Sequence, residues 1–182
     1  TFIGNGGIDT VDYSSSSTGV TVNLTTGAGT AGLAAGGSLI GIANLTGSAT
    51  GNNSLTGDTN ANVLTGGAGN DYLDGAGGAD TLLGLGGNDT IVYRGGEALV
   101  DGGTGTNTLN LAAAVTVNLG NADQTTGDAV NVANFQNVDA SALSAAVSIT
   151  GSSGVNLLTG GSGADTIDGN GGADVIDAGA GD

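Results

Sequence analysis

One aliphatic side chain returns at every ninth position over a long stretch of this chain. The series runs through Leu55, Leu64, Leu73, Leu82 and Ile91, and mostly small or polar residues fill the positions between them. Self-similarity at a fixed period indicates a repeat architecture in which successive units stack on one another. We therefore expect these side chains to point inward and to form a thin aliphatic ladder between two facing sheets.

The polar positions keep the same phase. Residues 66–92 read GGAGNDYLD GAGGADTLL GLGGNDTIV, with glycine in the fourth column, aspartate in the sixth and an aliphatic residue in the eighth. The phase extends back through 48–65, returns at 102–110 after a degenerate unit at 93–101, and reappears at 151–177 and at 4–12. The eighth column, and so the predicted core, comprises Val11, Leu55, Leu64, Leu73, Leu82, Ile91, Leu109, Leu158, Ile167 and Ile176.

Two segments interrupt the period and resemble each other. Residues 13–47 and 111–147 contain strand-like alternation, as in GVTVNL at 19–24 and AVTVNL at 114–119. We expect one continuous elongated domain with five parts: the end of a repeat block at 1–12, a β-rich insert at 13–47, a repeat block at 48–110, a second β-rich insert at 111–147 and a repeat block at 148–182. The chain begins and ends within a repeat, which indicates a segment of a longer array.

Composition points to a hard cation as the ligand. The 17 acidic residues face a single basic residue, Arg94, and the formal net charge is −16. This balance argues against nucleic acid and anionic membrane surfaces, which both attract Lys and Arg. Histidine and cysteine are absent, so the preferred ligands of transition metals are missing, whereas carboxylate and carbonyl oxygens suit calcium. No apolar stretch is long enough to span a membrane.

The repeat GGAGNDYLD resembles the nonapeptide G-G-x-G-x-D-x-U-x of the RTX calcium-binding family, and clean and degenerate copies cover somewhat over half of the chain. The resemblance implies an all-β fold, a parallel β-roll (a right-handed β-solenoid), here with two β-rich inserts. It also implies that six residues of each unit form a turn, that three form a strand, and that two units complete one coil. Residues eighteen apart would then stack on the same edge.

In that family, the second, fourth and sixth positions of one turn and the first, third and sixth of the turn above bind the ion. Several calcium ions are therefore expected, and glycine and alanine would act only through main-chain oxygen. The resulting sets are Gly67, Gly69 and Asp71 with Gly84, Gly86 and Asp89; Asp58, Asn60 and Asn62 with Gly75, Gly77 and Asp80; Ala49, Gly51 and Asn53 with Gly66, Ala68 and Asp71; Leu85, Gly87 and Asp89 with Gly102, Thr104 and Asn107; and Ser152, Gly154 and Asn156 with Gly169, Gly171 and Asp174.

Departures from the pattern predict weaker sites. Asparagine in the sixth column, at 53, 62, 107 and 156, removes one negative charge, so those sites should be weak or empty. Ala98 leaves the position above Asp80 without a carboxylate, and that site should fail. Gly161, Gly163 and Asp165 form half of a site whose upper part lies beyond residue 182, and Asp9 has no partner in register.

The spacing explains why calcium would hold such a row together. Adjacent strands lie about 4.8 Å apart, and calcium–oxygen distances are about 2.3–2.6 Å, so one ion reaches oxygens on two stacked turns. Without the ion the aspartates repel one another along the row. A thin ladder of aliphatic side chains cannot readily offset the backbone entropy of so many glycines. We therefore expect the repeat blocks to be disordered without calcium.

The leading functional hypothesis is a structural one: a calcium-dependent segment of a large secreted or cell-surface bacterial protein, in a surface layer, an adhesin or an extracellular filament. Expected partners are calcium ions, further copies of the chain and contacts at the cell surface or matrix. Without His, Cys or Lys we expect no enzyme activity. The alternatives are a carboxy-terminal folding and secretion module of a secreted protease or lipase and, as a minor one, ice binding by a partly regular threonine row.

Overall fold

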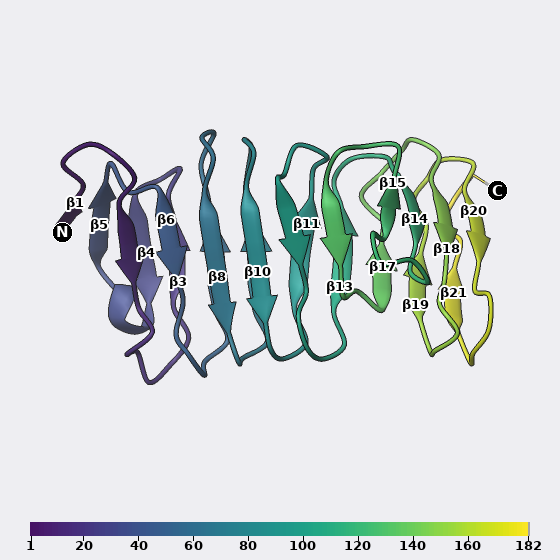
Figure 1. Cartoon of the computed structure of the whole chain (residues 1–182), viewed down its shortest axis with the longest axis horizontal. Coiled ribbons are helices and arrows are strands. Elements are labelled where there is room, and N and C mark those ends of the chain that lie inside the picture. The colour runs from purple at the N-terminus through teal and green to yellow at the C-terminus, as the bar shows by residue number, and fades with distance from the viewer. Residues whose placement is uncertain (182) are drawn as a thin grey trace.

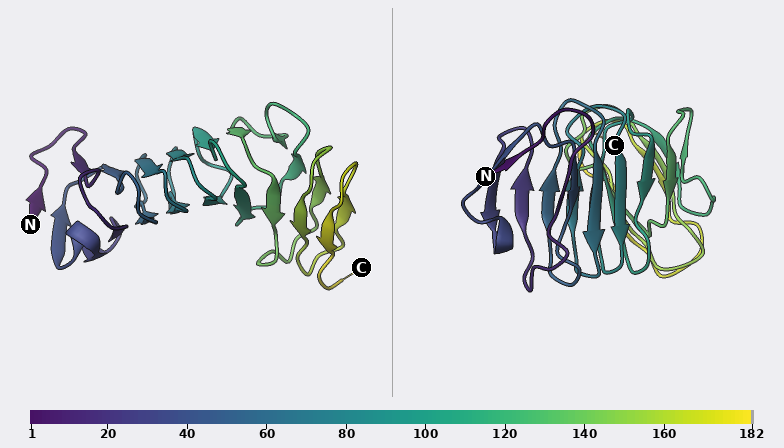
Figure 2. Two further views of the ribbon diagram at one scale, coloured as in Figure 1. Left: turned by 90° about the horizontal axis from the view of Figure 1, so that it is seen from below. Right: turned by 60° about the vertical axis from the view of Figure 1, so that its left-hand side comes forward.

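The chain forms two facing layers of short strands in a computed structural model, which describes residues 1–181. It passes back and forth between the layers, so that one coil stacks beside the next along the long axis (Figure 1). The stack is elongated, and its middle part is narrower than its two ends (Figure 2). The all-β class and the parallel β-roll architecture expected from the sequence are confirmed.

The first layer is an 11-stranded sheet. Its strands, in spatial order, are β1 (Phe2–Ile3), β5 (Gly37–Ile40), β4 (Ala28–Ala31), β3 (Thr21–Asn23), β7 (Ser54–Thr56), β9 (Tyr72–Asp74), β11 (Thr90–Tyr93), β13 (Thr108–Leu111), β17 (Asn137–Asp139), β19 (Leu157–Thr159) and β21 (Val175–Asp177).

The second layer consists of a 6-stranded sheet followed by a 4-stranded sheet. The former contains β2 (Thr10–Asp12), β6 (Asn44–Thr46), β8 (Val63–Gly67), β10 (Thr81–Leu85), β12 (Leu99–Asp101) and β16 (Asn131–Ala133). The latter contains β15 (Thr125–Thr126), β14 (Thr116–Asn118), β18 (Ser148–Thr150) and β20 (Thr166–Asp168). The single helical element is a 3-10 turn, η1 (Gly32–Ala34), among the described residues.

Strand register follows the nonapeptide period. In the first layer Ser54 pairs with Tyr72, and Tyr72 with Thr90, in parallel strands. In the second layer Val63 pairs with Thr81 in the same way. Each of these pairs is eighteen residues apart, as two nonapeptides per coil require. The six-residue turns are possible because glycines such as Gly78 and Gly87 adopt positive φ angles of 116° and 104°.

The two inserts join the stack but enlarge different layers. In the first insert β4 pairs antiparallel with both β3 and β5, so the extra strands extend the first layer. In the second insert β15 pairs antiparallel with β14, which extends the second layer. Their sequences resemble each other, yet the chain reverses direction in the first layer in one case and in the second layer in the other.

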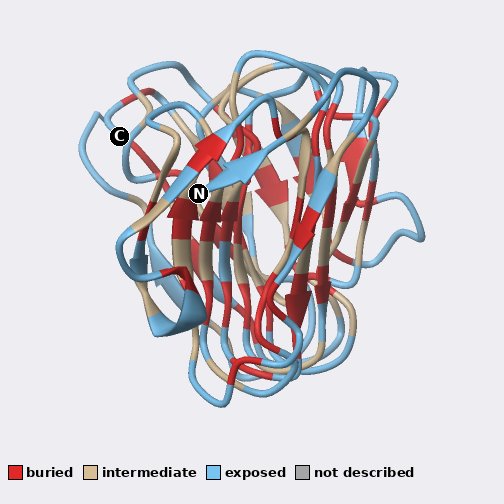
Figure 3. Ribbon diagram, turned by 90° about the vertical axis from the view of Figure 1, so that its left-hand side faces the viewer, coloured by how far each residue is buried: buried red, intermediate tan, exposed pale blue. Residues whose placement is uncertain are grey.

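The eighth column forms the core, as predicted, except that Ile167 is only half-buried and Ile176 is exposed. Buried strand positions face each other across the two layers (Figure 3). Leu55, Leu64, Leu73 and Leu82 have no exposed surface. Ile176, which was also expected inside, is 47% exposed, because β21 has a neighbouring strand on one side only and no further coil covers it within the described residues. Larger buried side chains, Tyr93 and Phe135, thicken the core near the second insert.

A buried glutamine connects the two sheets of the second layer. Gln124 is 5% exposed, and its Nε2 donates to the carbonyl oxygens of Leu119 (3.1 Å) and Phe135 (2.9 Å). Its Oε1 accepts from the Phe135 N–H (2.8 Å), and its own N–H donates to the carbonyl oxygen of Val132 in β16 (2.7 Å). These bonds organise the second insert without any need for metal.

Gln124→Leu is expected to lower the free energy of unfolding by at least about 2 kcal/mol, because it leaves buried backbone groups of Leu119 and Phe135 unpaired. Urea denaturation in saturating calcium measures the change. The matched control is Asn121→Leu, at an exposed position of the same insert. Equal stability of the two variants would contradict a role for the buried amide.

Candidate calcium-binding turns

Turns join the two layers along both long edges of the stack, and the two edges differ in the side chains that their turns carry. The turns that lead from the second layer to the first layer form what we call the first turn edge. They lie at 13–20, 47–53, 68–71, 86–89, 102–107, 134–136, 151–156 and 169–174. The second turn edge leads the other way, and its turns include 4–9, 41–43, 57–62, 75–80, 94–98 and 160–165. Residues in the sixth column of each repeat end these turns, directly before a strand.

The sixth column of the first turn edge forms a ladder of side-chain to backbone hydrogen bonds, with one break between Gln136 and Asn156. Each side-chain oxygen accepts from the N–H of the residue in the preceding coil, eighteen positions earlier. The bonds run from Asn53 N–H to Asp71 Oδ1 (2.7 Å), from Asp71 N–H to Asp89 Oδ1 (2.8 Å), from Asp89 N–H to Asn107 Oδ1 (2.9 Å), and later from Asn156 N–H to Asp174 Oδ1 (3.0 Å). The structure thus brings the predicted sixth-column residues of this edge into contact.

Gln136 belongs to this ladder, although it lies within the second insert. Its Oε1 accepts from the N–H of Asn107 (2.7 Å), where a repeat would place aspartate or asparagine. The strand after it, Asn137–Asp139, pairs with β13 at a separation of 29 residues instead of eighteen. A signal was present in the sequence, because QNVD at 136–139 has the spacing of the sixth to ninth columns with glutamine in place of aspartate.

The second oxygen of two aspartates in this ladder is buried and has no partner. Asp71 and Asp89 are 3% and 1% exposed, and the Oδ2 atom of each is buried without a hydrogen bond. A Cβ added at Gly66 would lie close to Asp71 Oδ2 and 2.8 Å from the carbonyl oxygen of Gly84. A carboxylate oxygen and a carbonyl oxygen from successive coils therefore converge beside a glycine. This is a donor set that fits calcium.

The same environment disfavours negative charge. Burial raises the pKa of Asp71 above its ordinary value, against hydrogen bonds from Asn53 that lower it. Burial raises the pKa of Asp89 to about 6, and the neighbouring charge of Asp71 acts in the same direction. Asp80, on the second turn edge, also has its pKa raised to about 6, by burial and by the charges of Glu97, Asp58 and Asp74. These carboxylates lack the positive charge that would stabilise them.

These shifts predict opposite effects of pH with and without calcium. The folded-state pKa of Asp80 and Asp89 is about 6, above the ordinary 3.8, so the fold binds protons that the unfolded chain releases. In calcium-free buffer, β-structure should therefore be greater at about pH 5 than at pH 7.5. Calcium affinity should fall as the pH drops below about 6, because protons compete with the ion. Circular dichroism and calcium titration at the two pH values measure both effects, and parallel trends would contradict the prediction.

The second turn edge brings together fewer of the predicted residues. Asn62 N–H donates to Asp80 Oδ1 (2.8 Å), and Val147 N–H donates to Asp165 Oδ1 (2.9 Å). Alanine interrupts this column at 43 and 98. The N–H of Ala98 donates to the carbonyl oxygen of Asp80 (2.7 Å), but the Ala98 side chain offers no oxygen.

Asp9 has a neighbour that the sequence did not reveal. The sequence suggested no partner in register, whereas its carbonyl oxygen accepts from the N–H groups of Ala43 (2.9 Å) and Asn44 (3.0 Å). The first insert separates these turns by 34 residues, which hides the register. Alanine at 43 means that the adjacent turn adds no carboxylate.

Asparagine in the sixth column supplies an N–H donor in place of a charge. The Asn53 Nδ2 donates to the carbonyl oxygens of Ser48 (3.1 Å) and Gly51 (2.9 Å) and to Asp71 Oδ1 (2.9 Å). The Asn62 Nδ2 similarly donates to the carbonyl oxygen of Ala43 (2.7 Å). An amide nitrogen thus satisfies oxygens that calcium would otherwise bind, which is a physical reason for weaker sites at these positions.

Other predicted ligands lie in the turns but already carry hydrogen bonds. The second-column carbonyl oxygens of Ala49, Gly67 and Leu85 accept from third-column N–H groups of the next coil, at 2.9, 2.9 and 2.8 Å. Each carbonyl keeps a second lone pair for a metal. Asp58 instead closes on its own turn, accepting from the N–H of Asn60 (2.8 Å) and from its side chain. Gly161, Gly163, Gly169 and Gly171 lie in turns of the last coils.

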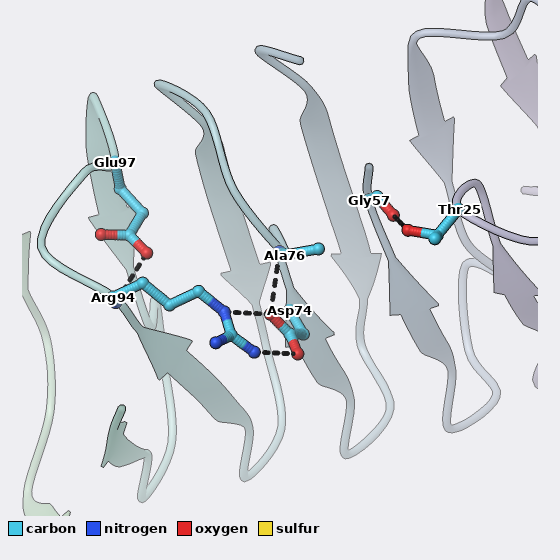
Figure 4. Close-up of polar contacts among 6 residues, drawn as sticks. All are labelled: Thr25, Gly57, Asp74, Ala76, Arg94 and Glu97. Carbon is cyan, nitrogen blue, oxygen red and sulfur yellow. Dashed lines mark hydrogen bonds and ion pairs between the residues drawn. The ribbon is translucent and has the colours of Figure 1, made fainter. Parts of the chain in front are cut away.

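The degenerate repeat at 93–101 contributes an ion pair within the chain in place of a predicted calcium ligand. Arg94, the one basic side chain, binds both oxygens of Asp74 (3.0 and 2.9 Å), while Glu97 accepts from the N–H groups of residues 94–96 (Figure 4). Nearby, Thr25 Oγ1 donates to the carbonyl oxygen of Gly57 (2.9 Å). The contacts of Arg94 and Glu97 secure the turn in which Ala98 replaces aspartate, whereas that of Thr25 ties the first insert to a turn two coils away.

Aspartates of the ninth column have a role that the sequence did not indicate. Their side-chain oxygens accept from the N–H two residues later and so begin the next turn. Such bonds of 2.7–3.1 Å join Asp12 to Ser14, Asp74 to Ala76, Asp168 to Asn170 and Asp177 to Gly179. This is the ordinary Asx turn, and it needs no metal.

Known repeat families provide an independent comparison. A model of the RTX calcium-binding nonapeptide repeat matches four times, at residues 49–82, 56–91, 75–97 and 150–182. The chain therefore contains RTX calcium-binding nonapeptide repeats, a type of repeat that occurs in secreted bacterial proteins. A search of curated proteins gives no match.

No helix in the described chain is long and apolar enough to cross a membrane. Within residues 1–181 no three acidic side chains gather into a metal site, so main-chain oxygens would have to complete any calcium shell.

Proposed function

Because the chain carries RTX calcium-binding nonapeptide repeats, we propose that it is a calcium-dependent structural segment of a large secreted or cell-surface bacterial protein. The parent would be a surface layer protein, an adhesin or an extracellular filament, and the segment would order when it meets extracellular calcium. The observation that carries the proposal is the pair of buried, unpartnered Oδ2 atoms of Asp71 and Asp89 in successive coils.

Different atoms of the turn residues would bind calcium and hold the coils in register. Calcium, when bound, would supply the positive charge that offsets the carboxylates of stacked turns. Asp71 and Asp89 would offer Oδ2, while their Oδ1 atoms and N–H groups keep the coils in register. First-column glycines such as Gly66 and Gly84 leave room beside these oxygens that any side chain would fill. The stacked aspartates destabilise the calcium-free fold by their mutual repulsion. With calcium bound, the same aspartates would join its coils.

The lack of side chains for acid–base or nucleophilic catalysis also agrees with a structural role. The sequence has no histidine, cysteine or lysine to act as base or nucleophile. The carboxylates with raised pKa values lie in the repeat ladder, and so are better explained as metal ligands than as an acid and base pair. We therefore propose no catalytic activity for this segment.

Calcium titration followed by circular dichroism and light scattering on the same sample tests the proposal. We expect β-structure to rise at about 10⁻⁴–10⁻³ M calcium, the range of extracellular modules, and magnesium at equal concentration to have little effect. A joint increase of β-structure and mass favours a surface layer or filament. An increase of β-structure in a monomer favours a spacer or the folding module of a secreted enzyme. Complete β-structure in calcium-free buffer at pH 7.5 would contradict calcium-dependent folding.

A further inference from the structure

A second row of side chains runs along the first turn edge, in the fifth column. Asn52 Oδ1 accepts from the N–H of Asn70 (2.9 Å), Asn70 Oδ1 from the N–H of Asn88 (2.8 Å), and Asn88 Oδ1 from the N–H of Thr106 (2.8 Å). Each bond spans eighteen residues, one coil. In the adjacent sixth-column ladder the acceptor lies in the later coil, whereas here it lies in the earlier one. Two rows of opposite direction therefore fasten each turn to the next.

The second turn edge has no such row. Its fifth-column residues over the same coils are Ala61 and Ala79, whose side chains cannot accept a hydrogen bond, and then Glu97, which binds its own turn. Its sixth column is also interrupted, at Ala43 and Ala98. The two edges are thus built on one repeat but differ in how firmly their turns are joined.

The asparagine row joins turns that carry two buried carboxylates in successive coils. Asp71 and Asp89 lie in the turns that it joins, and each is buried with an unpartnered oxygen. Two like charges in successive coils push the turns apart before an ion arrives. Gly87 and Gly105 leave room for the row, because a Cβ at either would lie 3.1 Å from the Oδ1 atom of Asn70 or Asn88 in the preceding coil. Bonds from neutral asparagine side chains hold the spacing without adding charge.

We infer that Asn70 and Asn88 are positioning residues which hold the first turn edge in its calcium-binding arrangement, so that this edge orders at lower calcium than the second. The inference rests on the proposed calcium-dependent folding. The pair Asp71 and Asp89 carries more charge than Asn62 and Asp80 and favours the same order of binding. Substitutions between asparagine and alanine leave charge unchanged, and so separate the row from this effect.

The experiment follows amide hydrogen exchange of each turn during a calcium titration of the full chain. In the native sequence, turns 68–71 and 86–89 should become protected at lower calcium than turns 57–62 and 75–80. Asn70→Ala with Asn88→Ala should raise the midpoint of the first edge about tenfold and leave the second edge unchanged. Ala61→Asn with Ala79→Asn transfers the row to the second edge and should lower its midpoint.

Asn70→Asp with Asn88→Asp keeps the side-chain oxygen that accepts the hydrogen bond but adds one negative charge to each turn, and so separates the bond from the charge. Protection of the Asn88 and Thr106 amides should persist in this variant and be lost in the alanine variant. Calcium-dependent protection that is equal on both edges in all variants would overturn the positioning role while leaving calcium binding intact. Protection of both edges that needs no calcium would instead contradict the proposed function, and the alanine variant would still show whether the row holds the turns.

Discussion

Asp89→Asn is expected to weaken calcium binding on the first turn edge by roughly tenfold or more, since it removes one ligand charge from the strongest predicted site. The substitution is mild for the fold. Asparagine occupies the next position of the same ladder, where Asn107 Oδ1 accepts from the N–H of Asp89 (2.9 Å). The Oδ1 of an asparagine at 89 can accept from Asp71 N–H in the same way. Isothermal titration calorimetry with calcium measures the loss.

The control and the calcium-free state sharpen this prediction. Asp168→Asn removes the same charge at an exposed ninth-column position and keeps the Asx-turn oxygen, so it should change affinity little. Without calcium, Asp89→Asn should stabilise the fold, because it removes a buried carboxylate whose pKa is raised to about 6. Equal loss of affinity in both variants would mean that the overall charge of −16 attracts calcium without a defined site.

Leu73→Ala is expected to lower the free energy of unfolding by about 2–5 kcal/mol, a large part of the stability of an ordinary domain. Leu73 has no exposed surface, and in the first layer its strand lies between those of Leu55 and Ile91. Its removal leaves a cavity in a narrow core that the two facing layers share. In a stack of repeats each coil depends on its neighbours, so the loss should spread to both.

Urea denaturation in saturating calcium measures the effect, and the adjacent residue provides the control. Tyr72 lies on the same strand but faces outward, with 40% of its surface exposed. Tyr72→Thr keeps a residue with high strand propensity and should change stability by well under 1 kcal/mol. A comparable loss in both variants would place the stabilising contacts on the outer face instead of in the ladder.

The sequence predicted those parts of the fold that recur. Leu55, Leu73 and Asp71 could be placed because their columns repeat, and a period of nine with two units per coil fixes which residues stack. Contacts made only once left no such signal. Gln136 joins the ladder across 29 residues, and Tyr93 Oη donates to Asp128 (3.0 Å) across 35. These depend on the length and path of the second insert, which no periodicity determines.

The difference between the two turn edges was present in the sequence but could not be interpreted there. Asn70 and Asn88 alternate with Ala61 and Ala79 in the fifth column. Taken as one series of nonapeptides, this is ordinary variation at an unconstrained position. The register of β8, β9, β10 and β11 assigns alternate repeats to opposite edges. With that assignment, the asparagines form a row on one edge and the alanines lie on the other.

The inserts have a geometric consequence for the axis of the stack. Strands in a sheet are about 4.8 Å apart, so additional strands in one layer make it longer than the layer facing it, and the stack must curve toward the shorter side. The first insert lengthens the first layer, and the second insert lengthens the second. The final strand numbers almost balance, 11 against 6 and 4. The two curvatures therefore oppose each other, so the inserts offset each other along the axis of the described stack.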